Sequence, residues 1–190
     1  DHHPMKRTVG HIATLVLLCC SLTAPLAAQW KEALLPPPYD QGYYLDVYFL
    51  PGNQNLGWVC GMNGEIIRTT DGGASWRGAT IPGAFLEYVQ FLTPSIGYVS
   101  GHAGVFRSDD GGITWRDISP FDPNFEKGWG SYWINQNEGL YFVGGCASGI
   151  QAFYRTTDAG QSWTVSYGTE PMSGLSDGII FRNGSERVQA

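Results

Sequence analysis

An eight-residue motif occurs three times in this chain of 190 residues, at 69–76, 108–115 and 156–163. All three copies fit the pattern Ser/Thr-x-Asp-x-Gly-x-Ser/Thr-Trp, and an arginine precedes each copy. A repeat with a fixed period limits the possible folds more than any local pattern does, because each copy must form the same structural unit. The motif positions are Thr69, Asp71, Gly73 and Trp76, then Ser108, Asp110, Gly112 and Trp115, and finally Thr156, Asp158, Gly160 and Trp163.

The repeat period indicates the size of the unit. Asp71, Asp110 and Asp158 are 39 and 48 residues apart, and only short β-type segments and turns lie between them. This matches the four-stranded blade of a β-propeller. We therefore predict an all-β chain, a β-propeller of four-stranded antiparallel blades, with about three to three and a half blades present. The blades are expected near 43–80, 86–119 and 129–168, with the start of a fourth at 174–190.

Each blade is expected to contain four strands. In the first blade they are expected near 44–49, 57–61, 65–68 and 75–79. The second blade has them near 87–92, 97–101, 105–107 and 114–118, and the third near 131–135, 140–144, 152–155 and 162–166. If the strands run up and down from the axis outwards, the first turn and the motif turn share one face. The second turn and the connections between blades share the other.

The motif aspartates have a structural explanation. An Asp side chain accepts hydrogen bonds from backbone N–H groups of its own turn, and the following glycine adopts the positive φ that the turn requires. The tryptophan is expected to anchor the turn by burying its ring against the sheet. Since the three aspartates occupy the same place in each repeat, we interpret them as turn-forming residues and assign no catalytic residue.

The motif resembles the Asp-box of the bacterial neuraminidase repeat, which occurs in sialidases, sortilin-type receptors and xyloglucan-cleaving propellers. A longer match over 45–49, 57–61 and 64–76 is similar to the photosystem II assembly/stability factor-like propeller family. The resemblance extends from about Trp30 to the C-terminus. It implies an exported, non-enzymatic, seven-bladed propeller that handles other proteins.

Three blades cannot close a ring, because propellers need about 4 to 8. Residues 30–36 align with 76–82, so they are expected to form the outer strand of a closing blade whose inner strands are absent. Our hypothesis is a fragment of a larger ring. The alternative is a ring assembled from several short chains.

The N-terminal region resembles an export signal. Residues 1–4 precede Met5 and are interpreted as upstream read-through or a scar, whereas 5–28 have the basic, apolar and small-residue segments of a signal peptide. We expect a secreted, periplasmic or cell-surface protein without a stable membrane span. A net charge of -6 and a pI near 5.0 argue against nucleic acid as a partner.

Few side chains suggest metal or redox chemistry. After residues 1–28 are removed, His102 is the only histidine, so a multi-histidine metal site cannot form, and no cofactor is indicated. Cys60 and Cys146 are predicted to be unpaired, buried thiols, because a whole blade separates them. A sialidase would need three arginines on its substrate carboxylate, but Arg68, Arg107 and Arg155 all precede the motifs at a repeated position, which favours a structural role.

The face without the motif turns is the predicted binding face. Its candidate residues are Glu65, His102, Phe125, Trp129 and Tyr132, and the aromatic ones are assigned to a long connection or its end. Exposed aromatic side chains there would suit a protein partner, with a glycan as the other option. The alternative is that these rings fill the space between adjacent blades. The competing functions are a glycoside hydrolase or sialidase with catalytic residues outside this segment, and a carbohydrate-binding propeller.

Overall fold

A computed structural model describes residues 32–120, 128–144, 151–168, 180–182 and 186–188. The expected signal peptide at 5–28, Trp30, Phe125 and Cys146 lie outside these residues. No helix in the described part of the chain is long and apolar enough to cross a membrane.

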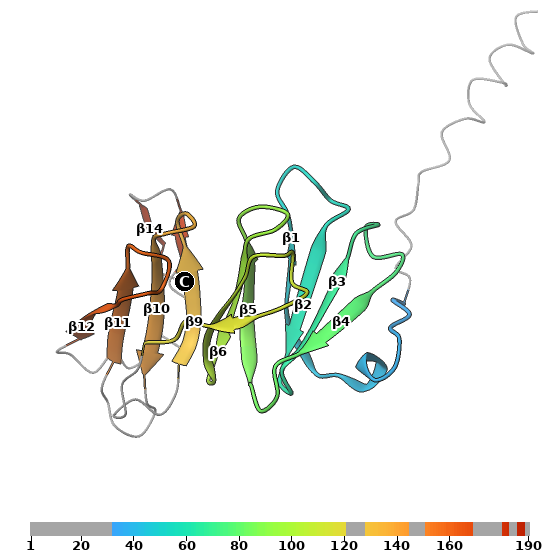
Figure 1. The fold of residues 1–190 in the computed structure, drawn as a ribbon, viewed down its shortest axis with the longest axis horizontal. Helices are drawn as coiled ribbons and strands as arrows, with labels where there is room; N and C mark the ends of the chain where they lie inside the picture. Colours follow the sequence, from blue (N-terminus) through green and yellow to red (C-terminus); the bar gives the residue numbers. More distant parts are fainter. Residues whose placement is uncertain (1–31, 121–127, 145–150, 169–179, 183–185, 189–190) are drawn as a thin grey trace, which may run out of the picture. The chain divides into compact units, whose positions relative to one another are not determined.

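Three antiparallel four-stranded sheets form the described fold, and in each the strands follow one another in sequence order (Figure 1). A 3-10 helix η1 (Tyr39–Gln41) precedes the first sheet, which consists of β1 (Tyr44–Phe49), β2 (Gly57–Gly61), β3 (Glu65–Thr69) and β4 (Arg77–Thr80). The second sheet consists of β5 (Leu86–Phe91), β6 (Gly97–Gly101), β7 (Gly104–Ser108) and β8 (Arg116–Asp117). The third consists of β9 (Gly128–Trp133), β10 (Gly139–Gly144), β11 (Gln151–Thr156) and β12 (Thr164–Gly168). A two-stranded sheet of β13 (Ile180–Arg182) and β14 (Glu186–Val188) follows.

This architecture confirms the predicted all-β fold with about three and a half blades. Several predicted strands differ from the observed ones, and residues 32–36 of the outer strand expected at 30–36 form no strand. The first strand of the third sheet begins at Gly128, not near Ser131, so Trp129 lies in β9 and not in a connection. The outer strands β4, β8 and β12 all begin two residues later than predicted. In each case the Ser or Thr at the predicted start is held in its turn by a hydrogen bond to the motif aspartate.

The first strands of the three sheets adjoin one another, with β5 next to both β1 and β9. Side chains of one sheet bond to the backbone of the next first strand. Asp46 accepts a hydrogen bond from Val89 N–H at 2.9 Å, and Gln90 binds both the N–H and the carbonyl of Trp133 at 2.8 and 2.9 Å. These contacts satisfy polar backbone groups that the strand ladders leave unpaired.

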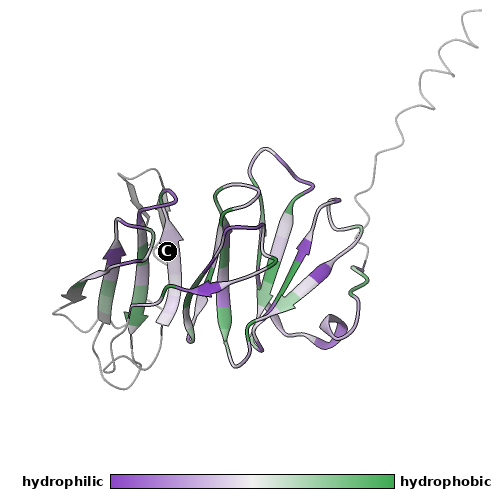
Figure 2. Cartoon of the chain, in the orientation of Figure 1, coloured by the Kyte–Doolittle hydropathy of each residue, from purple (hydrophilic) through white to green (hydrophobic). Residues whose placement is uncertain are grey.

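The core consists of two apolar clusters, one where the first and second sheets meet and one where the second and third meet. Hydrophobic residues along the strands supply both (Figure 2). At the centre of the first cluster, Trp58 of β2 stacks on Phe91 of β5 with ring centroids 3.5 Å apart. In the second cluster, Tyr98 of β6 stacks on Trp133 of β9 at 3.7 Å. Each sheet therefore packs on the next through the same pair of repeat positions.

Candidate functional site

The first motif turn, between β3 and β4, is closed by side-chain hydrogen bonds; we call the three motif turns Asp-box turns after the motif that they resemble. The Thr69 hydroxyl donates to Asp71 Oδ1 at 2.7 Å and accepts from Gly73 N–H at 2.8 Å. Asp71 Oδ1 also accepts from Ser75 N–H at 2.8 Å, and Asp71 Oδ2 accepts from the Ser75 hydroxyl at 2.6 Å. Every oxygen of the carboxylate is therefore occupied by its own turn.

The other two turns repeat this arrangement. Thr114 N–H and its hydroxyl both donate to Asp110, and Ser162 N–H and its hydroxyl both donate to Asp158. The hydrogen bonds from Ser75 and Ser162 lower the pKa of Asp71 and Asp158 to about 2. For Asp110, slight burial opposes the hydrogen bonds from Thr114, Ser108 and Ile113, but these still lower the pKa to about 2. An acid with so low a pKa cannot serve as a proton donor near neutral pH.

The Asp-box turns also bind the first turn of their own sheet. Gly72, Gly111 and Ala159 each donate a backbone hydrogen bond to that turn, to the carbonyls of Asn55, Ser95 and Asn137 respectively, at 2.8 to 3.0 Å. The two kinds of turn therefore lie at the same end of each sheet, as strand parity predicts.

The motif tryptophans are half-buried, so the expectation of a ring buried against the sheet holds only in part. Trp76 Nε1 donates to the carbonyl of Gly73 within its own turn at 3.1 Å. Trp163 Nε1 instead donates to the carbonyl of Ile118 at the end of the second sheet, at 2.9 Å. The motif ring thus closes a turn in one repeat and joins two sheets in another.

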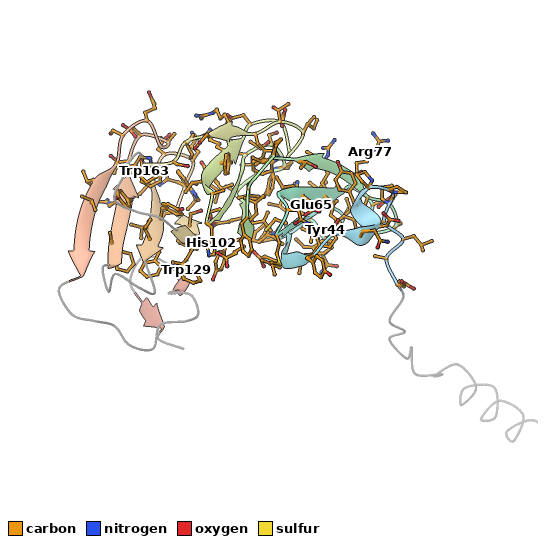
Figure 3. All side chains as sticks on the ribbon, turned by 90° about the horizontal axis from the view of Figure 1, so that it is seen from below. Tyr44, Glu65, Arg77, His102, Trp129 and Trp163 are labelled. Carbon is orange, nitrogen blue, oxygen red and sulfur yellow. The ribbon has the colours of Figure 1, made fainter. Side chains whose placement is uncertain are left out.

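The predicted binding residues His102 and Trp129 lie close together (Figure 3). His102 lies in the turn between β6 and β7, and Trp129 lies in β9. The Trp129 ring meets the His102 ring edge-on at 5.2 Å, and its Nε1 donates to the carbonyl of Gly144 at 2.7 Å. The Phe85 ring stacks on the His102 ring, with ring centroids 4.6 Å apart. Glu87 Oε2 is 3.7 Å from His102 Nε2, and burial raises the pKa of Glu87. We call Phe85, Glu87, His102 and Trp129 the histidine cluster.

Glu65 lies apart from the histidine cluster, beside Tyr44 in the first sheet (Figure 3). Both of its carboxylate oxygens accept hydrogen bonds from Asn63, at 3.0 and 3.1 Å. Burial, followed by the charge of Glu65, raises the pKa of Tyr44 to about 12. Tyr132 is half-buried in β9, paired with Leu140 of β10. Glu65 therefore does not form one site with His102 and Trp129, and Phe125 lies outside the described residues.

Sequence reasoning missed Phe85 and Glu87, which lie at the start of β5. It also missed Asp46, whose carboxylate accepts from Val47 and Val89 N–H and whose pKa is raised by burial. One feature of the sequence could have identified both Glu87 and Asp46. Asp and Glu are disfavoured within strands, so an acid inside an apolar strand segment calls for a partner.

Two of the arginines that precede the motifs make contacts within the fold. Arg107 is buried, donates to Asp109 Oδ1 and to the carbonyl of Gln136, and lies over the Tyr98 ring. Arg155 pairs with Glu138. Among the residues that the structure describes, no three His, Cys, Asp or Glu side chains group as metal ligands. Cys60 is buried and free, as predicted, and burial raises the pKa of its thiol.

The family follows from a match over most of the chain. Residues 22–169 match the family described as photosynthesis system II assembly factor YCF48. The chain belongs to this family. It is 33% identical over 87 residues to the photosystem II assembly lipoprotein Ycf48 of Synechocystis sp., which covers 44% of this chain and 25% of that protein. A xyloglucanase of Paenibacillus sp. is 30% identical over 167 residues, covering 70% of this chain and 16% of the enzyme.

Solved structures agree on the fold. YCF48 from Cyanidioschyzon merolae is 27% identical with a TM-score of 0.58, covering 73% of this chain and 40% of that one. A YCF48 bound to D1 peptide is 24% identical with a TM-score of 0.57, covering 72% of this chain and 44% of that one. The chain therefore spans less than half of the length of each of these relatives.

Proposed function

We propose that this chain is part of an exported, non-enzymatic assembly-factor-like propeller that binds a segment of another protein. Family membership supports an assembly-factor-like propeller. A relative of the same fold binds the D1 peptide, which supports a protein partner over a glycan. The segments 5–28 and 29–190 are proposed to be the signal peptide and the partial propeller.

The histidine cluster is the proposed contact for that segment. Its rings come from two sheets and are only half-buried, so flat apolar surface remains available beside a carboxylate in a desolvated setting. Aromatic rings combined with a few polar groups are typical of residues that dominate binding energy. The Asp-box aspartates are unsuited to binding, because each already accepts hydrogen bonds from its own turn. The proposal therefore rests on one contrast, between the half-buried rings of the histidine cluster and the Asp-box aspartates that already bind their own turns.

The test is equilibrium binding of a synthetic peptide with the sequence of the D1 segment bound by YCF48, compared with a shuffled peptide. We expect Trp129→Ala to weaken binding at least about 10-fold, since a central aromatic contact contributes about 2 kcal/mol or more. Trp76→Ala is the matched control, because Trp76 is also half-buried but lies in an Asp-box turn. Equal losses in the two variants would contradict the assignment of the histidine cluster.

The xyloglucanase relatives support one alternative function, a glycoside hydrolase. Such an enzyme uses a general acid with a raised pKa, and Glu87 is a carboxylate of that kind. The alternative predicts release of reducing ends from xyloglucan oligosaccharides and loss of this activity in Glu87→Gln. We expect no release by the unaltered chain, and activity abolished by Glu87→Gln would contradict our proposal.

A further inference from the structure

The first strand of each four-stranded sheet contains one extra residue. At one point of each strand, two residues that pair with consecutive residues of the second strand are separated by a residue outside the ladder. This residue is Leu45 in β1, Glu87 in β5 and Trp129 in β9. Such a β-bulge re-aims the side chain of the extra residue, and bulges are frequent beside functional sites. Glu87 and Trp129 therefore occupy equivalent positions in two adjoining strands.

These two bulges meet at one histidine. His102 follows Gly101, which pairs with Leu86 directly before the bulge in β5. Glu87 Oε2 is 3.7 Å from His102 Nε2, and the Trp129 ring meets the His102 ring edge-on. The second sheet has a described neighbour on both sides, because β5 adjoins both β1 and β9. The bulge that carries Glu87 therefore lies inside the row of described sheets and not at its end.

The carboxylate of Glu87 is poorly satisfied within the fold. Its Oε2 is buried from solvent and accepts no hydrogen bond from the described residues. His102 Nε2, at 3.7 Å, is beyond hydrogen-bond distance. A buried acceptor without a donor is costly, so a ligand that donates a hydrogen bond would remove this cost. The Glu87 side chain is 19% exposed, so part of it remains open to a ligand.

The charges around Glu87 favour a cationic ligand. Burial, followed by the charges of Asp117 and Glu87, raises the pKa of Tyr141, so Asp117 adds a second negative charge near the histidine cluster. Among the described residues, no lysine or arginine lies within ion-pair distance of Glu87. The whole chain has a net charge of -6. A positively charged group would therefore find an acceptor that the described residues leave without a permanent cation.

The aromatic rings of the cluster favour the same kind of ligand. Phe85 stacks on His102, and Trp129 meets His102 edge-on, so rings surround the histidine beside the carboxylate. Ammonium and guanidinium groups are attracted to aromatic rings, and the aliphatic stems of lysine and arginine pack well against apolar surface. A carboxylate combined with aromatic rings thus suits a long cationic side chain better than a neutral polar one.

We propose that the histidine cluster binds a positively charged side chain, lysine or arginine, of the protein segment that this chain recognises. Its charged group donates a hydrogen bond to Glu87, and its aliphatic stem packs against the Phe85 and Trp129 rings. The inference rests on the proposed function and specifies the chemistry of one bound residue. The equivalent bulge of the first sheet holds Leu45, so that position offers no second carboxylate.

The test is host–guest peptide binding at about pH 8, where histidine side chains are ordinarily neutral. The probes are two acetylated and amidated pentapeptides of alanine, one with lysine and one with norleucine at the centre. Norleucine has the aliphatic stem of lysine without the ammonium group. Binding to the full chain is followed by the NMR signal of the Trp129 indole N–H. We expect the lysine peptide to bind at least about 10-fold more tightly, and a lysine peptide that binds no more tightly than the norleucine peptide would overturn the proposal.

Two variants show whether Glu87 is the source of the preference. Glu87→Gln keeps the size of the side chain but removes its charge, so the two peptides should bind equally. Glu138→Gln is the matched control, because Glu138 is also a partly buried carboxylate but lies beside Arg155 at the Asp-box end of its sheet. It should keep the preference for lysine. A preference that persists in Glu87→Gln, or that is lost in both variants, would overturn the proposal. The comparison of the two peptides on the unaltered chain still decides if Glu87→Gln does not fold.

Failure of this inference is distinguishable from failure of the proposed function. If the D1 peptide binds through Trp129 but lysine is not preferred over norleucine, the contact surface stands and the cation assignment falls. If lysine is preferred but the D1 peptide does not bind, the cation site stands and the proposed peptide partner falls.

Discussion

The comparison of Phe91→Ala with Phe49→Ala measures how much the contact between adjoining sheets stabilises the chain. The two phenylalanines occupy the same repeat position, and both lie over the glycine of the neighbouring second strand. Phe91 is buried, stacked on Trp58 and met edge-on by the Trp115 ring at 6.0 Å. Phe49 has no covering ring among the described residues. The pair therefore isolates the effect of the preceding sheet.

The expected loss for Phe91→Ala is about 3 to 5 kcal/mol, because a buried ring is removed and a cavity remains. Within that loss, the stacking with Trp58 accounts for about 0.5 to 1.5 kcal/mol. For Phe49→Ala we expect about 1 kcal/mol, since the ring is partly exposed and its removal leaves no closed cavity. The two variants should differ by about 2 to 4 kcal/mol.

The assay is equilibrium unfolding in urea, followed by circular dichroism. If the unfolding free energies of the two variants fall with urea concentration at the same slope, the two variants unfold between the same states. Losses of unfolding free energy that agree within about 0.5 kcal/mol would refute the reasoning. The ring of the preceding sheet would then add nothing to the stability of the phenylalanine that it covers.

Three further predictions concern the turns and the contacts between sheets. The Asp-box aspartates have folded-state pKa values of about 2, below their unfolded values. The stability that they contribute is therefore present above about pH 4 and is lost as the pH falls towards 2. Urea unfolding measured across that range should show this loss of stability, and the loss should be smaller in Asp158→Asn. Arg107→Met should lower the free energy of unfolding by about 2 kcal/mol, mostly through the hydrogen bonds to Gln136 and Tyr98, because the Asp109 carboxylate is half-exposed; a thermal midpoint equal to that of the unaltered chain would contradict this. Gly112→Ala should cost more than Gly83→Ala, since both have positive φ but only Gly112 would bring its Cβ within 3.1 Å of the Trp58 ring; equal thermal midpoints would contradict the close approach.

The repeat made the fold predictable, whereas strand ends depended on side chains. Both strands 44–49 and 57–61 were predicted with the observed bounds, because glycine and turn residues mark their ends. The start of β9 was missed by three residues, since two of these three, Gly128 and Gly130, are glycines, which are disfavoured in strands.

The candidate site was only partly predictable. His102 and Trp129 were chosen separately, as a turn residue and as part of an aromatic segment, and the structure brings them together through the packing of two sheets. Glu87 was missed because its setting is created by residues of other turns and strands, which no local pattern reveals. Glu65 was chosen for its turn position, but it is bound by Asn63 of the same turn.

The most direct test of the account compares Asp110→Asn with Trp129→Ala for both stability and peptide affinity. We predict that the Asp110 variant unfolds at a lower urea concentration but binds the D1 peptide with unchanged affinity, because Asp110 only closes its turn. The Trp129 variant should show the larger loss of affinity. An Asp110 variant of unchanged stability that no longer binds the peptide would contradict the structural role of the Asp-boxes.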